Sequence, residues 1–182
     1  SQEIEPGEGW PYHRILKALA AKPTMDGREL AQMIVKEYVA SYPKSQAVTQ
    51  SAFDLAALAA VQKAANEFGT ALAKAYKKSD FAAQGAIASA RVRAQGYDHP
   101  DYVDLVDFCT RVAASLPALA ALAKKIENSV AACVFANGAP NAQVRASRGL
   151  SIYLPLGKVS PLYGKLDFAK GGWADFLAAR VA

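Results

Sequence analysis

The balance between helices and strands limits the fold of this chain more than any other feature of its sequence. Apolar residues recur at helical spacing in six or seven segments of the 182 residues, whereas residues 150–155 alone have convincing strand character. This segment is short, contains β-branched and aromatic residues, and is closed by Pro155. A lone strand cannot pair the backbone groups at its own edges, so we expect the sheet that it joins to lie largely in sequence outside this chain.

Start and stop signals divide the helical sequence into separate helices. Asp26 and Glu29 form a capping-box pattern, and Ser51 and Asp54 form a second, box-like start. Pro11 suits a first helical position, where its missing N–H costs nothing. The expected helices span residues 11–21, 26–41, 51–76, 80–95, 102–115, 117–137 and 173–181.

The composition is that of a globular domain. With 52% hydrophobic residues, the chain has enough apolar material for one sizeable core. The net charge is +5, but Lys and Arg are scattered along helical segments, so we interpret them as solvated helix faces and expect no nucleic-acid partner. The longest apolar runs, such as residues 116–123, are too short to span a bilayer, so we expect no membrane partner either.

Residues 1–12 (SQEIEPGEGWPY) form an acidic segment punctuated by glycine and proline. The segment contains Glu3, Glu5 and Glu8 and no Lys or Arg, within a chain of positive net charge. Two glycines flank Glu8, so the backbone can bend sharply there and a ligand can approach closely. We therefore interpret this segment as a loop that forms one wall of a binding pocket.

Neither cysteine has the surroundings of a nucleophile or of a metal ligand. Cys109 and Cys133 lie in apolar sequence without CxxC or metal-ligand spacing, which indicates small buried thiols. His13 and His99 are interpreted as surface or turn histidines. We therefore assign no catalytic residue, no metal site and no cofactor to this chain.

Asp104 and Asp107 lie three residues apart, on one face of the helix expected at residues 102–115. This spacing suits a cation, but two carboxylates without further oxygen ligands make a poor calcium site. We interpret both side chains as solvent-exposed. Asp54 is interpreted as a helix-start residue and not as part of a site.

Five short blocks, in order along the chain, resemble those of clostripain-type cysteine peptidases. Besides residues 1–12, they are residues 49–55 (TQSAFDL), 102–108 (YVDLVDF), 148–155 (RGLSIYLP) and 163–173 (YGKLDFAKGGW). That family resembles caspases and gingipains in its α/β fold. The resemblance implies that residues 1–182 form a single C-terminal segment of a caspase-like α/β/α sandwich. This segment would be mostly helical with one or two strands, and the rest of the sheet would lie upstream.

The resemblance also implies an activity. The family carries its histidine in a His-Gly motif and its nucleophile in an Asp-Ala-Cys-Leu-Met-Gly-like motif, and neither motif occurs in these 182 residues. We therefore expect the nucleophile upstream of Ser1, and the chain alone should be inactive. Clostripain-type peptidases cut polypeptides after arginine, and some relatives cut after lysine. The family also implies that the protein is exported or extracellular.

By the same resemblance, the acidic loop binds the basic side chain of the substrate. Glu8 matches by position the acid of the family's Pro-Gly-acid-Gly block, and a carboxylate there can face a guanidinium or ammonium group. Glu5 and Glu3 share one face if the segment begins as a strand, so one of them can line the cleft. Trp10 can pack against the stem of a bound arginine. Alternatively, Glu8 is an exposed turn residue that favours the N-terminus of the next helix, and Trp10 is an anchor into the core.

Two other functions stay open at this point. Ala-rich helices pack closely and need no active site, so the chain can instead be a non-catalytic helical module that binds a partner or self-associates. If the upstream sequence lacked the histidine and cysteine motifs, the protein would be a pseudopeptidase. As a peptidase, its partners are a polypeptide substrate with a basic P1 residue and the upstream part of the same protein.

Overall fold

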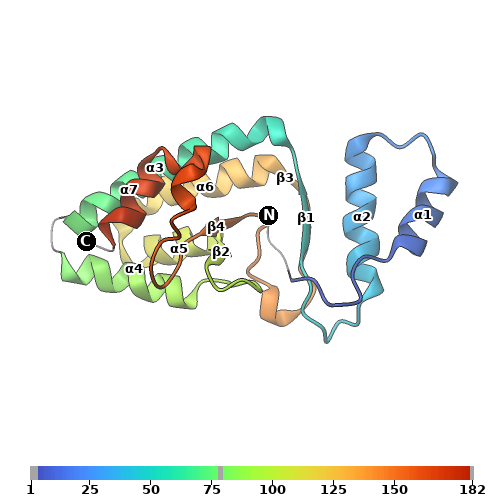
Figure 1. Cartoon of the computed structure of the whole chain (residues 1–182), viewed down its shortest axis with the longest axis horizontal. Coiled ribbons are helices and arrows are strands. Elements are labelled where there is room, and N and C mark those ends of the chain that lie inside the picture. Colours follow the sequence, from blue (N-terminus) through green and yellow to red (C-terminus); the bar gives the residue numbers. More distant parts are fainter. Residues whose placement is uncertain (1–3, 78–79, 181–182) are drawn as a thin grey trace.

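Short strands separate pairs of helices along most of the chain in the computed structural model, which describes residues 4–77 and 80–180. The helices are α1 (Tyr12–Ala21), α2 (Gly27–Ser41), α3 (Leu58–Lys77), α4 (Phe81–Arg93), α5 (Leu105–Ser115), α6 (Ala120–Cys133) and α7 (Gly172–Ala179). The strands are β1 (Gln50–Phe53), β2 (Tyr102–Asp104), β3 (Val134–Gly138) and β4 (Ser151–Tyr153). Short 3-10 turns lie at Leu55–Ala57, Pro117–Leu119, Ala142–Val144, Tyr163–Lys165 and Asp167–Ala169. Figure 1 shows α1 and α2 on one side of β1 and β3, and the other helices as a bundle on the opposite side.

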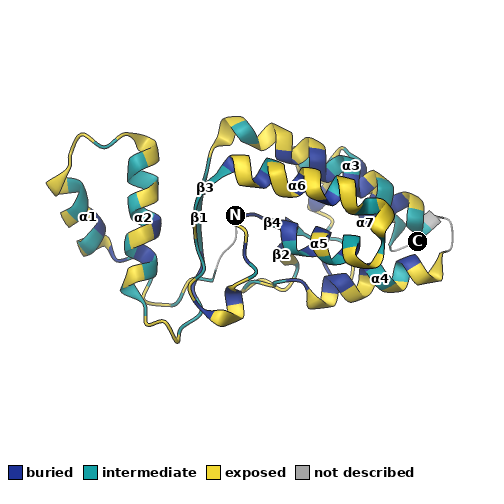
Figure 2. Ribbon diagram, turned by 180° about the vertical axis from the view of Figure 1, so that it is seen from behind, coloured by how far each residue is buried: buried dark blue, intermediate teal, exposed yellow. Residues whose placement is uncertain are grey.

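The helical bundle is built around α3. This helix packs against α6 and α7, while α5 packs against α4 and α6. The core surrounds Trp173, whose ring centroid lies 6.0 Å from that of Phe108 and 5.5 Å from that of Phe176. Trp173 Nε1 donates a hydrogen bond to the carbonyl of Tyr153 at 2.9 Å, so the core reaches β4 and the indole nitrogen is satisfied. Figure 2 shows the buried residues on the inner faces of these helices.

Helices α3 and α7 approach each other closely at two glycines. A Cβ added to Gly69 would lie 2.6 Å from backbone atoms of Gly172 and Trp173. A Cβ added to Gly172 would lie 2.1 Å from Thr70 Oγ1 and 2.2 Å from the carbonyl oxygen of Asn66. The Asn66 side chain completes the contact, because its Oδ1 accepts a hydrogen bond from Trp173 N at 3.1 Å. The two glycines therefore allow Trp173 to enter the core.

The strands form two small antiparallel sheets in the described part of the chain. β1 pairs with β3, with a bulge between Ala52 and Phe53. β2 pairs with β4, so that Val103 lies opposite Ile152. Helix α2 packs against both β1 and β3. The first sheet therefore lies between the α1–α2 pair and the bundle (Figure 1).

The structure corrects the expected number of strands. The fold is a mostly helical α/β arrangement, as expected, but the described residues contain four strands instead of one or two. β1 and β2 replace the starts of the helices expected at residues 51–76 and 102–115, and β3 replaces the end of the helix expected at 117–137. These strands contain aromatic or β-branched residues, but pairing with a segment far along the chain overrides local helical periodicity. The strand expected at residues 150–155 is confirmed as β4.

The predicted helix starts are largely confirmed. Asp26 and Glu29 form the capping box of α2, and Asp26 Oδ1 accepts a hydrogen bond from Glu29 N at 2.8 Å. Pro11 is the N-cap of α1, one residue before the first helical position. Asp54 caps a 3-10 turn with its side chain, but Ser51 lies in β1 and forms no box with it. None of the described helices is long and apolar enough to cross a membrane.

Candidate functional site

The acidic loop contains a tight turn that presents Glu8 to solvent. Gly9 N donates a hydrogen bond to the carbonyl of Pro6 at 2.9 Å, and Gly7 and Glu8 occupy the two middle positions. Gly9 has a φ of +68°, a left-handed conformation that residues with side chains rarely adopt. The Glu8 side chain is exposed, so its carboxylate is available to a ligand.

Aromatic residues from α2 and just after it hold this loop in place. The Tyr42 hydroxyl donates to the carbonyl of Gly9, and the Tyr38 hydroxyl donates to the carbonyl of Ile4 at 3.1 Å. Trp10 is half-buried, and its ring centroid lies 6.3 Å from that of Tyr38. Because these contacts hold the loop on both sides of the turn, α2 and its C-terminal extension determine where the loop lies.

The start of the loop is also tied to the segment before β1. Ile4 N donates to Thr49 Oγ1 at 2.9 Å, and Thr49 N donates to the carbonyl of Ile4 at 3.3 Å, which forms an isolated antiparallel bridge. The next residue, Glu5, donates from its backbone N to Asp98 Oδ2 at 3.3 Å. This contact brings the loop at residues 96–101 beside the acidic loop.

Three carboxylates gather around the turn. The Glu5 side chain lies over it, with Oε1 3.8 Å from the position that a Cβ on Gly9 would take. Burial, followed by the negative charges of Glu8 and Glu5, raises the pKa of Tyr42, which indicates that both carboxylates lie near its hydroxyl. Glu8 and Asp98 form no ion pair with any residue in the described part of the chain. We call Glu5, Glu8 and Asp98 the acidic cluster.

The structure brings together most of the residues that the sequence predicts for substrate binding. Glu8 lies in the anchored turn, and Glu5 and Trp10 flank it in the same loop, while Glu3 lies outside the described residues. Asp98 was not predicted, because it is 93 residues away from Glu5 in the sequence. Its one local signal is the turn-forming sequence of residues 97–100 (YDHP).

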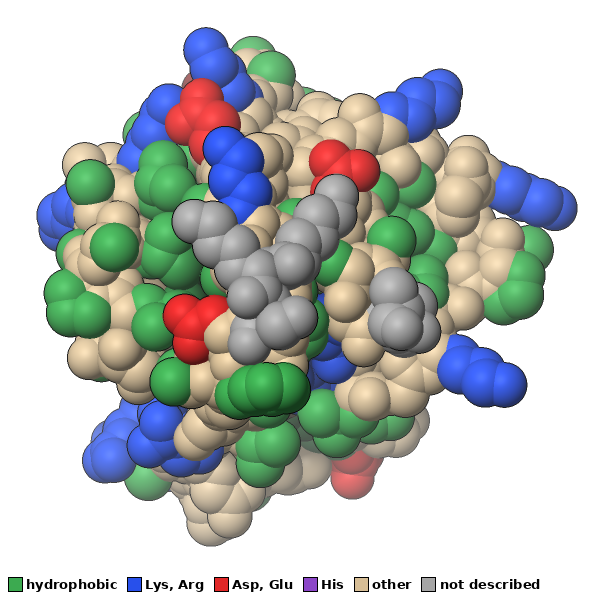
Figure 3. Space-filling model, turned by 90° about the vertical axis from the view of Figure 1, so that its left-hand side faces the viewer, with side chains coloured by type: hydrophobic (Ala, Val, Ile, Leu, Met, Phe, Trp, Pro, Cys, Tyr) green, Lys and Arg blue, Asp and Glu red, His purple; other side chains and the backbone are tan. Residues whose placement is uncertain are grey.

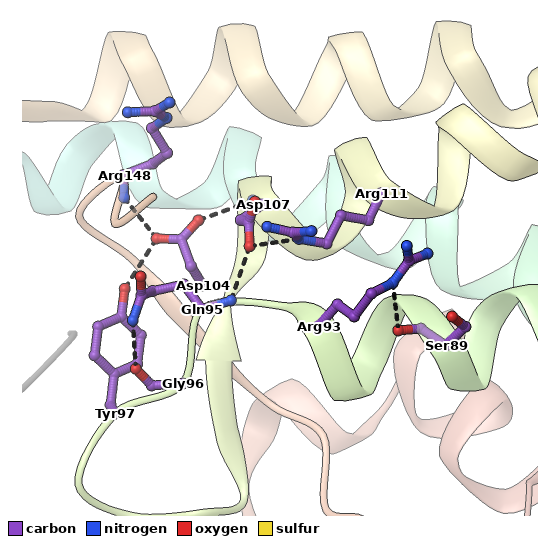
Figure 4. Close-up of polar contacts among 9 residues, drawn as sticks. All are labelled: Ser89, Arg93, Gln95, Gly96, Tyr97, Asp104, Asp107, Arg111 and Arg148. Atoms are coloured by element: carbon purple, nitrogen blue, oxygen red, sulfur yellow. Dashed lines mark hydrogen bonds and ion pairs between the residues drawn. The ribbon is translucent and has the colours of Figure 1, made fainter. Parts of the chain in front are cut away.

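A buried network holds the loop that carries Asp98 (Figure 4). The Tyr97 hydroxyl donates to Asp104 Oδ2 at 3.0 Å. It also lies 3.2 Å from Ser147 Oγ. Arg148 N donates to the same Asp104 oxygen at 2.6 Å. Asp104 thus joins β2 to the loop after α4 and to the segment before β4. Because Tyr97 is fixed, its neighbour Asp98 stays beside the acidic loop.

Asp104 is fully buried, which corrects the expectation of a solvent-exposed carboxylate. It is the N-cap of α5, and its Oδ1 accepts a hydrogen bond from Asp107 N at 2.9 Å. Burial raises the pKa of Asp104 to about 6, against the hydrogen bonds that stabilise its charged form. Asp107 is half-buried and accepts hydrogen bonds from Gln95 N and Arg111 Nε, both at 2.8 Å, so it links the end of α4 to α5.

We expect the buried Asp104 carboxyl to lower the stability of the protein as pH rises from about 4 to about 6. The pKa is 3.8 in an ordinary environment and about 6 in the folded protein, so the folded state binds the proton more tightly. The resulting stabilisation is fully present below pH 3.8 and is lost as pH rises through about 6. A shift of this size corresponds to about 3 kcal/mol as an upper bound.

Urea unfolding of the wild type and of Asp104→Asn at several pH values between 4 and 7 measures this effect. The variant has no proton to release at this position, so the difference in free energy of unfolding between the two proteins should change across the window. A constant difference would contradict the assignment of a raised pKa to Asp104.

Both cysteines are buried, as predicted. Burial raises the pKa of Cys109, and Cys133 Sγ donates to a backbone carbonyl at 3.3 Å. His99 lies in an exposed turn, where its Nδ1 accepts a hydrogen bond from Asp101 N at 3.3 Å, and His13 is exposed on α1. Among the described residues, no group of His, Cys, Asp and Glu is arranged to hold a metal ion.

Comparison with known proteins gives one match. The sequence model of the clostripain family matches residues 1–174, which include the acidic loop, the Asp104 network and all four strands. No curated protein and no solved structure gives a significant match to the chain.

Proposed function

The chain belongs to the clostripain family of cysteine peptidases, and on that premise we propose that it forms the C-terminal part of an endopeptidase that cleaves after basic residues, arginine above all. In this proposal the chain supplies the wall of the primary specificity pocket and a structural shell, and the catalytic histidine and cysteine come from upstream sequence. The observation that carries the proposal is the acidic cluster on its anchored turn.

The acidic cluster has the chemistry that a basic side chain requires. A guanidinium group presents five N–H donors in a planar fork, and carboxylates are its strongest partners in proteins. Glu8 offers an exposed carboxylate at the tip of the turn, and Glu5 and Asp98 add negative potential around it. We assign Glu8 as the main contact for the P1 arginine, with Glu5 beside it and Glu3 as a further contact. The half-exposed ring of Trp10 offers apolar surface for the aliphatic stem.

An apolar cavity supports the proposal that the sheet continues into upstream sequence. The cavity has a volume of about 410 Å³, and Phe53 of β1, Val61 of α3 and Ile152 of β4 contribute to its walls. Tyr163 also lines it, and the buried Tyr163 hydroxyl has no hydrogen-bond partner in the described structure. A buried hydroxyl without a partner is unfavourable. We infer that a strand from the upstream part fills this cavity and covers its apolar walls.

The arrangement of helices supports a caspase-like α/β/α sandwich for the complete domain. Helix α2 packs against one side of β1 and β3, and the bundle lies on the other side (Figure 1). A strand in the cavity would join the two small sheets into one, with helices on both faces. The acidic loop would then rim a cleft at the carboxyl ends of the strands, where open α/β sheets bind their ligands.

The proposal predicts that peptidase activity requires both the upstream sequence and the 182-residue chain. The full-length protein should cleave peptides with arginine at P1 and lose this activity after thiol alkylation, because its nucleophile is a cysteine. The 182-residue chain alone should be inactive and should bind a hydrophobic dye, because the cavity beside Tyr163 is open to solvent. Fluorogenic peptide assays and dye titrations on both proteins measure these properties.

Two outcomes would favour the other candidate functions. A full-length protein that binds arginyl peptides but leaves them intact would be a pseudopeptidase. A 182-residue chain that is monomeric, excludes the dye and melts in one cooperative transition would be an autonomous helical module.

A further inference from the structure

A small cavity between α4 and α7 shares no lining residue with the acidic cluster. Its volume is about 150 Å³, and two arginines, Arg91 of α4 and Arg180 just after α7, contribute to its lining. The remaining walls are apolar and consist of Ile87, Ala88, Val92, Leu154, Leu156 and Phe176. Apolar walls with two guanidinium groups suit a ligand that has an apolar body and a negatively charged end.

Arg91 is buried, and no described carboxylate pairs with it directly. It exposes 6% of its surface, and it donates from Nε to the carbonyl of Leu154 and from Nη2 to the carbonyl of Pro100 at 2.6 Å. These two bonds use two of the five N–H donors of the guanidinium, and no Arg91 nitrogen in the described structure is both fully buried and without a partner, so the remaining donors are accessible. Burial, followed by the positive charge of Arg180, lowers the pKa of Arg91, and Asp101 opposes this effect. A buried guanidinium in such surroundings favours the binding of an anion.

Arg180 brings a second positive charge to the same cavity. Its Nη1 donates to the carbonyl of Pro155 at 2.9 Å, and its guanidinium carbon lies 5.8 Å from the centroid of the Phe176 ring. Arg180 also forms no ion pair within the part of the chain that the structure describes. Figure 3 shows the end of the molecule at which α7 finishes, with Lys and Arg side chains spread around it and few acidic ones in view.

We propose that this cavity binds a small monocarboxylate with a short aliphatic chain. The carboxylate accepts hydrogen bonds from Arg91 and Arg180, and the aliphatic chain contacts Ile87 and Phe176. A cavity of about 150 Å³ in another protein holds benzene, so the ligand has roughly six or seven non-hydrogen atoms. Binding would join α4 to the C-terminal end of α7, and the free energy of binding would add to that of folding.

Pentanoate is a suitable probe, and saturation-transfer NMR with the full-length protein measures its binding. We expect saturable binding that Arg180→Gln weakens about ten-fold or more, because one charge-assisted hydrogen bond is lost. Arg93→Gln is the matched control: Arg93 is exposed on the same helix and lies outside the cavity lining, so this variant should bind pentanoate like the wild type. Pentanol has the same chain without the charge and should bind at least about ten-fold more weakly.

A second variant tests the proposal from the opposite direction. Ala88→Glu places a carboxylate on the cavity wall, so it should raise the melting temperature and abolish pentanoate binding. The proposal is overturned if the wild type shows no saturable binding of pentanoate, or if pentanol binds as tightly as pentanoate. It is also overturned if Ala88→Glu leaves pentanoate binding unchanged.

Discussion

Replacing Glu8 by alanine in the full-length protein is expected to lower kcat/KM for cleavage after arginine by about 10- to 100-fold. Glu8 is the exposed carboxylate at the tip of the anchored turn, and in the proposed complex it accepts hydrogen bonds from the P1 guanidinium. A hydrogen bond to a charged group contributes about 1.5–3 kcal/mol, and each 1.4 kcal/mol is about a factor of ten in rate. Steady-state kinetics on a fluorogenic arginyl peptide measure the loss.

Two controls separate recognition from a general loss of activity. Glu127→Ala removes an exposed carboxylate that pairs with Lys124 on α6 at 2.8 Å, so it should leave the kinetics unchanged. A peptide with citrulline at P1 has nearly the shape of the arginyl peptide without its charge, so Glu8→Ala should affect its cleavage far less. Unchanged cleavage after arginine in Glu8→Ala would remove Glu8 from the pocket and leave Glu5 and Asp98 to be tested.

Replacing Gly69 by alanine is expected to destabilise the protein by about 3 kcal/mol or more. The new Cβ would lie 2.6 Å from the backbone at the start of α7, and backbone cannot move aside as a flexible side chain can. Helix α7 would have to shift, and Trp173 would move with it. Because the Trp173 side chain is fully buried, this shift would disrupt the packing of the core. Denaturant midpoints of the full-length protein measure the effect.

Gly85 offers a matched control for this substitution. It also lies inside a helix, but no atom beyond its chain neighbours and its own helical backbone lies within 4 Å of an added Cβ. Because alanine is the better helix former, Gly85→Ala should stabilise the protein by up to about 1 kcal/mol. Equal effects of the two substitutions would show that the close approach of α3 and α7 does not limit stability.

Local signals in the sequence were sufficient for the helix starts and for the acidic turn. The capping box of Asp26 and Glu29 involves residues three positions apart, and the glycines around Glu8 indicate a turn from adjacent sequence alone, although the distant residues Tyr38 and Tyr42 hold the loop in place. The strands β1 and β3 could not be predicted in the same way. Each exists because it pairs with the other, and helical periodicity continued through both segments.

The same limit applies to the candidate site. Asp98 reaches Glu5 through a contact between loops, and the burial of Asp104 results from contacts with Tyr97 and Arg148. Spacing along the chain places Asp104 on a helix face but does not reveal what covers it. Its role as the N-cap of α5 was visible only once β2 had replaced the first turn of the expected helix.

If the acidic loop binds the P1 side chain as proposed, the way in which Tyr38 and Tyr42 hold it determines how substrate preference can evolve. Both hydroxyls bind carbonyl groups of the loop backbone, so they keep its path whatever side chains it carries. Mutations at positions 5 and 8 can therefore change the accepted residue without a new loop conformation. Conversely, the loop grafted alone onto another scaffold would lose its shape, and a successful graft would have to include both tyrosines.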